Sequence, residues 1–179
     1  MGKIIALNCV ANGKIIQEKI FDNIWIQPAS GDAGGSLGSA LALWHIENGN
    51  KRKVNLKDNM KGSYLGTEYT QDEIEKELRF LGANFETFNY DDLINKTSEL
   101  LSNKNVIGWF QGRMEFGPRA LGSRSILADP RSDEMQKILN LKIKKRESFR
   151  PFAPSILRED LSDWFNIDID SPYMLIVAH

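Results

Sequence analysis

The segment from Gly112 to Pro154 places its cations in tight turns rather than along one solvated face of a helix. Glycine and proline interrupt the segment repeatedly, and both residue types favour turns whose backbone geometry is restricted. Guanidinium groups that are held on stiff loops can converge on one anion and bind it through paired hydrogen bonds. The cations of the segment that are candidates for such a site are Arg113, Arg119, Arg124, Arg131, Lys144, Arg146 and Arg150.

The positive charge is concentrated in one part of the chain. Residues 104–158 contain twelve Lys and Arg against five Asp and Glu, about +7, although all 179 residues together carry a net charge of −1. The near-zero total argues against nonspecific nucleic-acid binding by the chain as a whole. The local excess favours a local anionic ligand instead.

Composition limits where the protein works and what it can bind. Cys9 is the one cysteine, so no disulfide can form within the chain, and no apolar run approaches the roughly 20 residues that span a membrane. The N-terminus lacks a signal-peptide pattern, so we expect a cytoplasmic protein without a membrane partner. His45 and His179 are the two histidines, one in a predicted helix and one at the terminus, which argues against a metal site built from histidines of this chain.

The pattern of apolar and turn residues predicts a mixed α/β chain. We expect helices at residues 32–47, 71–81, 90–101 and 132–144, the last with Ser132 as its N-cap. We expect strands at residues 3–7, 14–21, 24–27, 85–88, 106–110, 125–128 and 173–178, with a hairpin turn at Asn12-Gly13 between the first two. A domain boundary is expected near residues 50–66 or in the helices that follow. Both ends look cut, and an unpaired terminal strand favours association between copies.

Two further features could bind a ligand. A glycine-rich turn leads into the helix at residue 32, where Gly34 and Gly35 would let backbone N–H groups approach an anion and Asp32 could ligate a metal. Helix capping and tight helix packing explain the same residues. Asn8 follows the first predicted strand, a position that often lines a ligand cleft, and hydrogen bonding within the hairpin explains it equally well.

The cations also have two alternative explanations. Structural ion pairing would use Glu115, Asp129 and Glu147 to neutralise some of them. Nucleic-acid binding would use aromatic side chains to stack on bases, although the apolar neighbours of these aromatics favour a place in the core. The aromatic residues concerned are Trp109, Phe110, Phe116, Phe149 and Phe152.

Several of these motifs together closely resemble the O-carbamoyltransferase family, typified by nodulation-factor, cephamycin and aminoglycoside carbamoyltransferases. The most specific block is GRMEFGPRALGSRSILADPR followed by IKKRESFRPFAPSIL. The similarity extends to LNCVANGKI, PASGDAGGSLGSAL and SPYM, and so to essentially the whole chain.

The resemblance implies two domains, incomplete at both ends. Residues 1–66 would be the C-terminal part of an actin-like ATPase-fold domain, in which a hydroxyl of a small-molecule or sugar acceptor is carbamoylated. Residues 67–179 would be the first part of a YrdC-like α/β domain with a mixed twisted sheet, which makes carbamoyl-adenylate from carbamoyl phosphate and ATP. ATP, Mg²⁺ and a divalent transition metal such as Fe²⁺ are the implied cofactors.

The resemblance also suggests roles for individual residues. Lys144, Arg146 and Arg150 are the expected catalytic cations, with Lys144 and Arg146 matching a Lys-x-Arg pair that binds nucleotide phosphates. Asp32 matches a metal ligand whose two histidine partners would lie upstream. The expected substrate- and nucleotide-binding residues are Arg113, Arg119, Arg124, Arg131, Asn8, Gly34 and Gly35. A double-stranded RNA-binding module and a nucleotide-binding module without chemistry are the rival functions.

Overall fold

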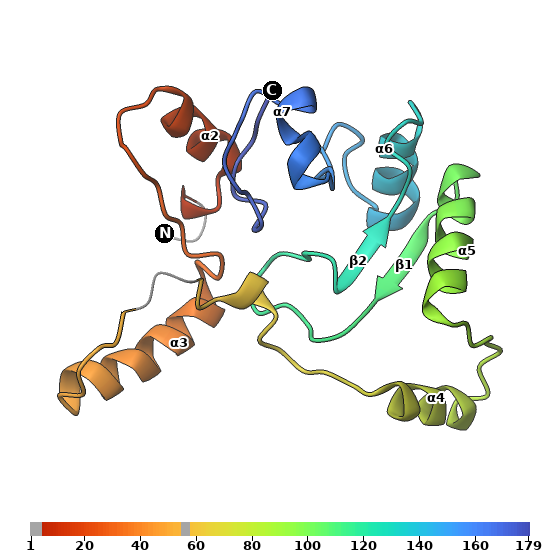
Figure 1. The fold of residues 1–179 in the computed structure, drawn as a ribbon, viewed down its shortest axis with the longest axis horizontal. Coiled ribbons are helices and arrows are strands. Elements are labelled where there is room, and N and C mark those ends of the chain that lie inside the picture. Colours follow the sequence, from red (N-terminus) through yellow and green to blue (C-terminus); the bar gives the residue numbers. More distant parts are fainter. Residues whose placement is uncertain (1–4, 55–57) are drawn as a thin grey trace. The chain divides into compact units, whose positions relative to one another are not determined.

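Figure 1 shows the fold of the computed structural model, which describes residues 5–54 and 58–179. Contacts within the chain divide it into two compact units. Unit 1 contains Met1–Gly66, Arg113–Leu121 and Ile156–His179. Unit 2 contains Thr67–Gly112 and Gly122–Ser155. Each unit is therefore assembled from segments that are distant in sequence.

Unit 1 is mostly helical, and its segments are held by buried polar side chains. Asn12 lies inside α2, where its Nδ2 donates hydrogen bonds to the carbonyl oxygens of Ala6 (3.0 Å) and Leu175 (2.9 Å). The N–H of Val177 donates to the carbonyl of Cys9 at 3.1 Å, so the C-terminal segment lies beside α2 (Figure 1). The elements are α2 (Cys9–Gln17), α3 (Asp32–Ala42) with a π-helical continuation (Leu43–Glu47), short 3₁₀ turns at Lys61–Ser63 and Arg158–Asp160, and α7 (Leu161–Trp164).

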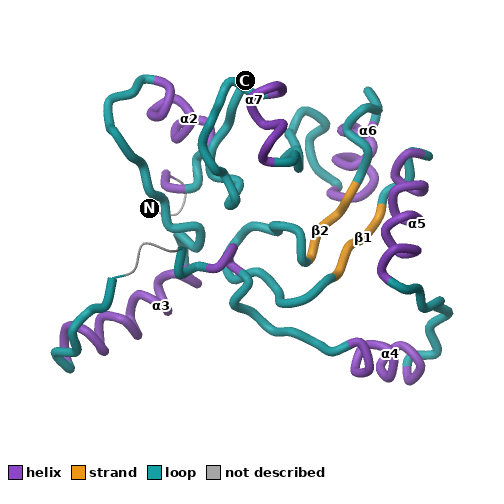
Figure 2. Tube along the Cα trace, in the orientation of Figure 1, coloured by secondary structure: helices purple, strands orange, loops and turns teal. Residues whose placement is uncertain are grey.

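Unit 2 combines helices with the one sheet found in the described residues. Strands β1 (Ile107–Phe110) and β2 (Arg124–Leu127) pair antiparallel, with Phe110 opposite Arg124, and α5 lies beside β1 (Figure 2). The Thr70 hydroxyl and the Glu73 carboxylate form a capping box at the start of α4. The helices are α4 (Gln71–Phe80), α5 (Tyr90–Ser102) and α6 (Met135–Ile138), which continues as a π-helical segment (Leu139–Lys144).

The structure confirms the four predicted helices and the strands at 106–110 and 125–128, each within three residues of its predicted bounds. The mixture of helices and a small antiparallel sheet fits the α/β class. The sheet formed by the described residues is two-stranded and antiparallel, so it lacks the parallel pairing of a mixed sheet. The division into domains at residues 1–66 and 67–179 stays a prediction.

Five predicted strands are wrong over their described residues. Residues 5–7, 24–27, 85–88 and 173–178 form no strand, residues 14–17 belong to α2, and residues 3–4 lie outside the described part. The predicted hairpin fails because the Asn12 amide is satisfied by carbonyls of other segments, one of them 163 residues away. Gly13 has no room for a side chain beside the Val177 carbonyl. Tertiary packing therefore overrides the local turn signal.

Two smaller predictions are also corrected. Ser132 does not cap α6 with its side chain, because its carbonyl accepts the N–H of Met135 and Glu134 occupies the N-cap position. Phe110 and Phe149, which the sequence places in the core, are 53% and 76% exposed. Within residues 5–54 and 58–179, none of the helices combines the length and apolarity needed to cross a bilayer.

Candidate anion site

The predicted site residues fall into two groups, one in each unit. Unit 1 holds Asn8, Asp32, Gly34, Gly35, Arg113 and Arg119. Unit 2 holds Arg124, Arg131, Lys144, Arg146 and Arg150.

Gly34 and Gly117 allow close packing at the start of α3. The N–H of Gly34 donates to the Ala29 carbonyl (3.0 Å), and the N–H of Gly35 donates to the Gly31 carbonyl (2.8 Å). A side chain at Gly34 would collide with that same Ala29 carbonyl, and one at Gly117 would meet Ala29 at 3.3 Å. Both predicted N–H donors are thus engaged within the protein.

The remaining predicted residues of unit 1 are held by backbone groups. Asn8 is the N-cap of α2, with its Oδ1 accepting the N–H of Ala11 at 3.1 Å, rather than the end of a strand. Arg113 donates to the Gly66 carbonyl (2.8 Å), and Arg119 donates through Nη2 to the Leu7 carbonyl (3.2 Å). The Nε of Arg119 is buried without a hydrogen-bond partner among the described residues.

The predicted metal ligand Asp32 begins α3. In the described part of the chain, no three side chains of the His, Cys, Asp or Glu type come together in a way that could hold a metal ion. The residues present therefore do not complete a metal site, and the role of Asp32 stays a prediction.

Tyr173, from the SPYM motif, closes a loop of unit 1. Its hydroxyl donates to the carboxylate of Asp58 and accepts the N–H of Gly62 at 3.1 Å. Burial and the hydrogen bond to Asp58 raise the pKa of Tyr173 to about 12, so it stays protonated near neutral pH. The tyrosine thus acts as a structural link between the 58–62 loop and the C-terminal segment.

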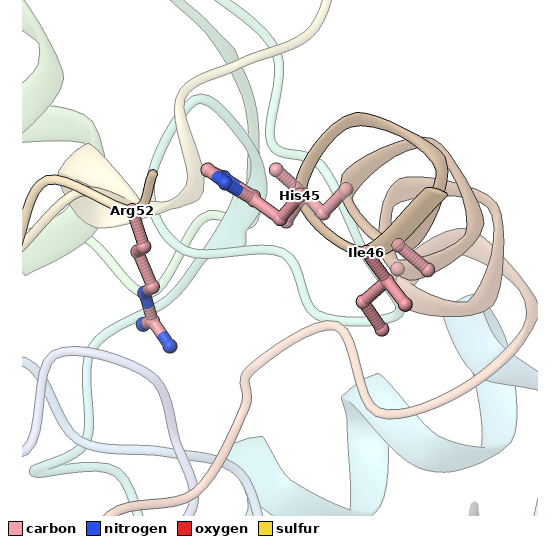
Figure 3. A pocket seen from close by; sticks show the side chains of 6 residues that line it. His45, Ile46 and Arg52 are labelled. Carbon is pink, nitrogen blue, oxygen red and sulfur yellow. The ribbon is translucent and has the colours of Figure 1, made fainter. Parts of the chain in front are cut away.

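Unit 1 also has an open hollow of about 420 Å³ along α3 and its continuation (Figure 3). His45, Ile46 and Arg52 line it, and the ring of His45 is held by a 2.8 Å contact between Nδ1 and the Asn50 carbonyl. None of the predicted site residues contributes to this hollow.

Two cations of unit 2 are engaged by internal partners. Arg131 binds Asp129 through Nε and Nη2 at 2.7–3.0 Å, and these hydrogen bonds hold the pKa of Asp129 down at about 2. Arg124 donates to the carbonyls of Gln111, Ser123 and Gly112, and its guanidinium lies 3.4 Å from the centroid of the Phe110 ring. The structure therefore shows Arg131 in an ion pair with Asp129, as the alternative of structural ion pairing predicts.

The other three cations lie together in residues 144–150, which we call the cationic turn. The π-helical segment ends at Lys144, the first residue of this turn, and Lys145 follows in the left-handed conformation (φ 48°). Arg146 donates through Nε to Oδ1 of Asn140 (2.7 Å), and its guanidinium lies 4.9 Å from the centroid of the Phe152 ring. Arg150 donates to the carboxylate of Glu147 at 2.9 Å.

The helix end and Glu147 set the electrostatics of the cationic turn. Lys142 and Lys144 occupy the last helical turn, where the helix dipole favours positive charge. A backbone hydrogen bond within Glu147, followed by the charge and hydrogen bond of Arg150, lowers the pKa of Glu147. The charge of Arg146 adds to this lowering, so both guanidinium groups lie within electrostatic reach of one carboxylate.

Asn140 organises the cationic turn and was missed by the sequence analysis. Its side chain is fully buried and contacts both Arg146 and the backbone of the turn. The signal that could have found it is a single amide within the apolar run Ile138 to Leu141.

Two family models match parts of this chain. The model described as carbamoyltransferase N-terminus matches residues 2–41, and the model described as carbamoyltransferase C-terminus matches residues 98–179. The chain belongs to the carbamoyltransferase family. The resemblance inferred from the sequence motifs is thereby confirmed. The carbamoyltransferase C-terminal match includes the cationic turn, and the N-terminal match includes Asn8, Asp32, Gly34 and Gly35.

Three relatives illustrate the range of the family. An uncharacterized protein of Synechocystis is 57% identical over 176 residues, covering 97% of this chain and 29% of the relative. Nodulation protein NolO of Bradyrhizobium diazoefficiens is 44% identical over 91% of this chain and 29% of its own length. The 3'-hydroxymethylcephem-O-carbamoyltransferase of Amycolatopsis lactamdurans is 35% identical over 94% and 30%, respectively. The chain thus spans less than a third of the length of these relatives.

Proposed function

We propose that this chain supplies phosphate-binding cations to an ATP-dependent O-carbamoyltransferase. The cationic turn would bind the phosphates of carbamoyl phosphate and ATP while carbamoyl-adenylate forms. Arg124, in the same unit as the cationic turn, would assist. Binding roles for Arg113, Arg119 and Arg131 stay predictions from the family resemblance. The carbamoyl group then passes from the adenylate to a hydroxyl of a small-molecule or sugar acceptor.

The observation that carries this proposal is the state of Arg146. Its Nε is bound by a neutral amide rather than a carboxylate, so its positive charge is not cancelled by that partner. Two highly charged substrates repel each other, and cations fixed before they bind reduce the free energy of bringing them together. The match to the carbamoyltransferase C-terminus over residues 98–179 supports the identity of those substrates.

The finer parts of the proposal follow from the same family. Residues 1–66 would belong to an actin-like ATPase-fold domain and residues 67–179 to a YrdC-like domain of a cytoplasmic enzyme, which could form homo-oligomers. Mg²⁺ would accompany ATP at the cationic turn. Asp32 would be one ligand of a divalent transition metal, whose site the described residues of this chain do not complete.

A calorimetric titration of the purified protein tests this proposal. Carbamoyl phosphate and a non-hydrolysable ATP analogue are titrated separately and together, with a short RNA duplex as a third ligand. We expect saturable binding of the small ligands that Arg146→Ala loses and the exposed-loop control Lys51→Ala retains. Equal effects of the two substitutions would refute the site.

The rival functions predict other outcomes in the same titration. RNA binding that weakens steeply with added salt, without binding of the small ligands, would favour the RNA-binding module. Binding of the ATP analogue that never depends on carbamoyl phosphate would favour a nucleotide-binding module without chemistry.

A further inference from the structure

We propose that Asn140 is a positioning residue, which holds Arg146 so that both Nη groups of its guanidinium face a phosphate group of the substrate. The inference rests on the proposed function, since it concerns the same site. It is carried by the hydrogen bonds around Asn140.

The Asn140 side chain forms hydrogen bonds with three residues of the cationic turn. Its Nδ2 donates to the carbonyls of Ser148 (3.0 Å) and Arg150 (2.8 Å), and its Oδ1 accepts from Arg146. Its own carbonyl accepts the N–H of Arg146 at 2.9 Å. The side chain is 0% exposed, and buried polar groups whose hydrogen bonds are all made restrict the structure around them.

Two contacts fix the orientation of the Arg146 guanidinium. Asn140 binds its Nε edge, and the ring of Phe152 lies 4.9 Å from its central carbon. Among residues 5–54 and 58–179, neither Nη group has a hydrogen-bond partner. The end of the guanidinium therefore keeps parallel N–H donors, which match two oxygens of one phosphate group.

The neutrality of Asn140 matters as much as its position. An aspartate there could hold the Nε edge equally well, but its charge would neutralise the cation that the phosphate needs. Its second oxygen would also face the carbonyls of Ser148 and Arg150, which now receive N–H donors. Asn140→Asp is therefore a near-isosteric substitution that disturbs both functions without leaving a cavity.

The experiment is a double-mutant cycle on the affinity for carbamoyl phosphate. Asn140→Asp is combined with Arg146→Lys, which keeps the positive charge but has neither the Nε donor nor the paired Nη groups. Each single substitution should weaken binding about tenfold, which corresponds to about 1.4 kcal/mol. In the Arg146→Lys background, Asn140→Asp should change the affinity less than about threefold, because its effect acts through the guanidinium. Thermal unfolding is followed in all four proteins.

The outcomes separate this inference from the proposed function. Wild-type affinity in Arg146→Ala would refute the proposed site itself. Loss of affinity in Arg146→Ala, with wild-type affinity in both Asn140→Asp and Arg146→Lys, would overturn only the role of Asn140. An equal loss from Asn140→Asp in both backgrounds would show a merely structural role and also overturn it.

Arg146→Lys changes a side chain that is only partly buried, so this variant should fold. It therefore tests the role of the guanidinium even if Asn140→Asp does not fold. A loss of about fivefold or more then supports the oriented guanidinium. Wild-type affinity shows that charge alone suffices, and the inference is wrong.

Discussion

The turn at residues 129–131 and the cationic turn hold their arginines in opposite ways. Arg131 lies against the carboxylate of Asp129, at distances of 2.7–3.0 Å. Arg146 lies against the amide of Asn140 at 2.7 Å. Both side chains are oriented, but the first pair is neutral overall and the second keeps a full positive charge. The chemistry of the partner therefore decides which cation can still bind an anion.

The glycine-rich segment of unit 1 extends the same comparison to backbone donors. The N–H groups of Gly34 and Gly35 have the character expected of an anion site, yet both donate to carbonyls at the start of α3. Their hydrogen-bonding capacity is consumed inside the protein. In the cationic turn, the Nη groups of Arg146 keep their hydrogen-bonding capacity.

The prediction with the largest expected effect compares the contributions of Arg146 and Arg131 to carbamoyl phosphate binding. Arg146→Ala should weaken carbamoyl phosphate binding by about 10- to 100-fold, the usual loss for hydrogen bonds that involve a charged group. Arg131→Ala should change the affinity less than about twofold, because its charge is already paired with Asp129. Isothermal titration calorimetry measures both constants. Similar losses in the two variants would abolish the distinction between the turns.

A second prediction concerns the glycines of unit 1. Gly34→Ala should lower the free energy of unfolding by about 1–3 kcal/mol, because the added methyl group meets the Ala29 carbonyl in a packed region. Gly35→Ala is the matched control, since nothing lies within 4 Å of its added carbon, and it should stabilise the helix by about 0.5–1 kcal/mol. Urea unfolding provides the comparison. A larger loss from Gly35→Ala would contradict the packing role.

The smallest expected effect is the pH dependence of the Asp129–Arg131 pair. The pKa of Asp129 falls from 3.8 to about 2 in the folded chain, so the pair stabilises the protein above about pH 4. This stabilisation should disappear as the pH falls toward 2 and the carboxylate gains its proton in both states. The gap in stability between wild type and Asp129→Asn should therefore be constant from about pH 7 to 5 and narrow below about pH 4.

Urea unfolding at several pH values measures that gap. Lys137→Ala, a substitution of an exposed residue in the same unit, is the control. Its difference in stability from wild type should not narrow at acid pH. A gap for Asp129→Asn that persists unchanged at about pH 2 would show that the carboxylate charge does not stabilise this turn.

Local signals in the sequence predicted much of unit 2. The helices predicted at residues 71–81, 90–101 and 132–144 are confirmed. The structure adds local reasons for the first two, a capping box at Thr70 and an acidic first turn of α5. The strands of the one described sheet were predicted as well. In unit 1 the first predicted strands failed, because Asn12 and Gly13 interact with residues near the C-terminus.

The sequence by itself determined the family, the four helices and the place where positive charge accumulates, because motifs, helical periodicity and charge density are properties of short segments. The tertiary structure decided which of those charges remain available. Arg131 has a carboxylate two residues away, whereas Arg146 is held by a buried amide six residues earlier in the chain. Which partner meets which arginine depends on how the turns fold back onto the helix, and spacing alone does not contain that information.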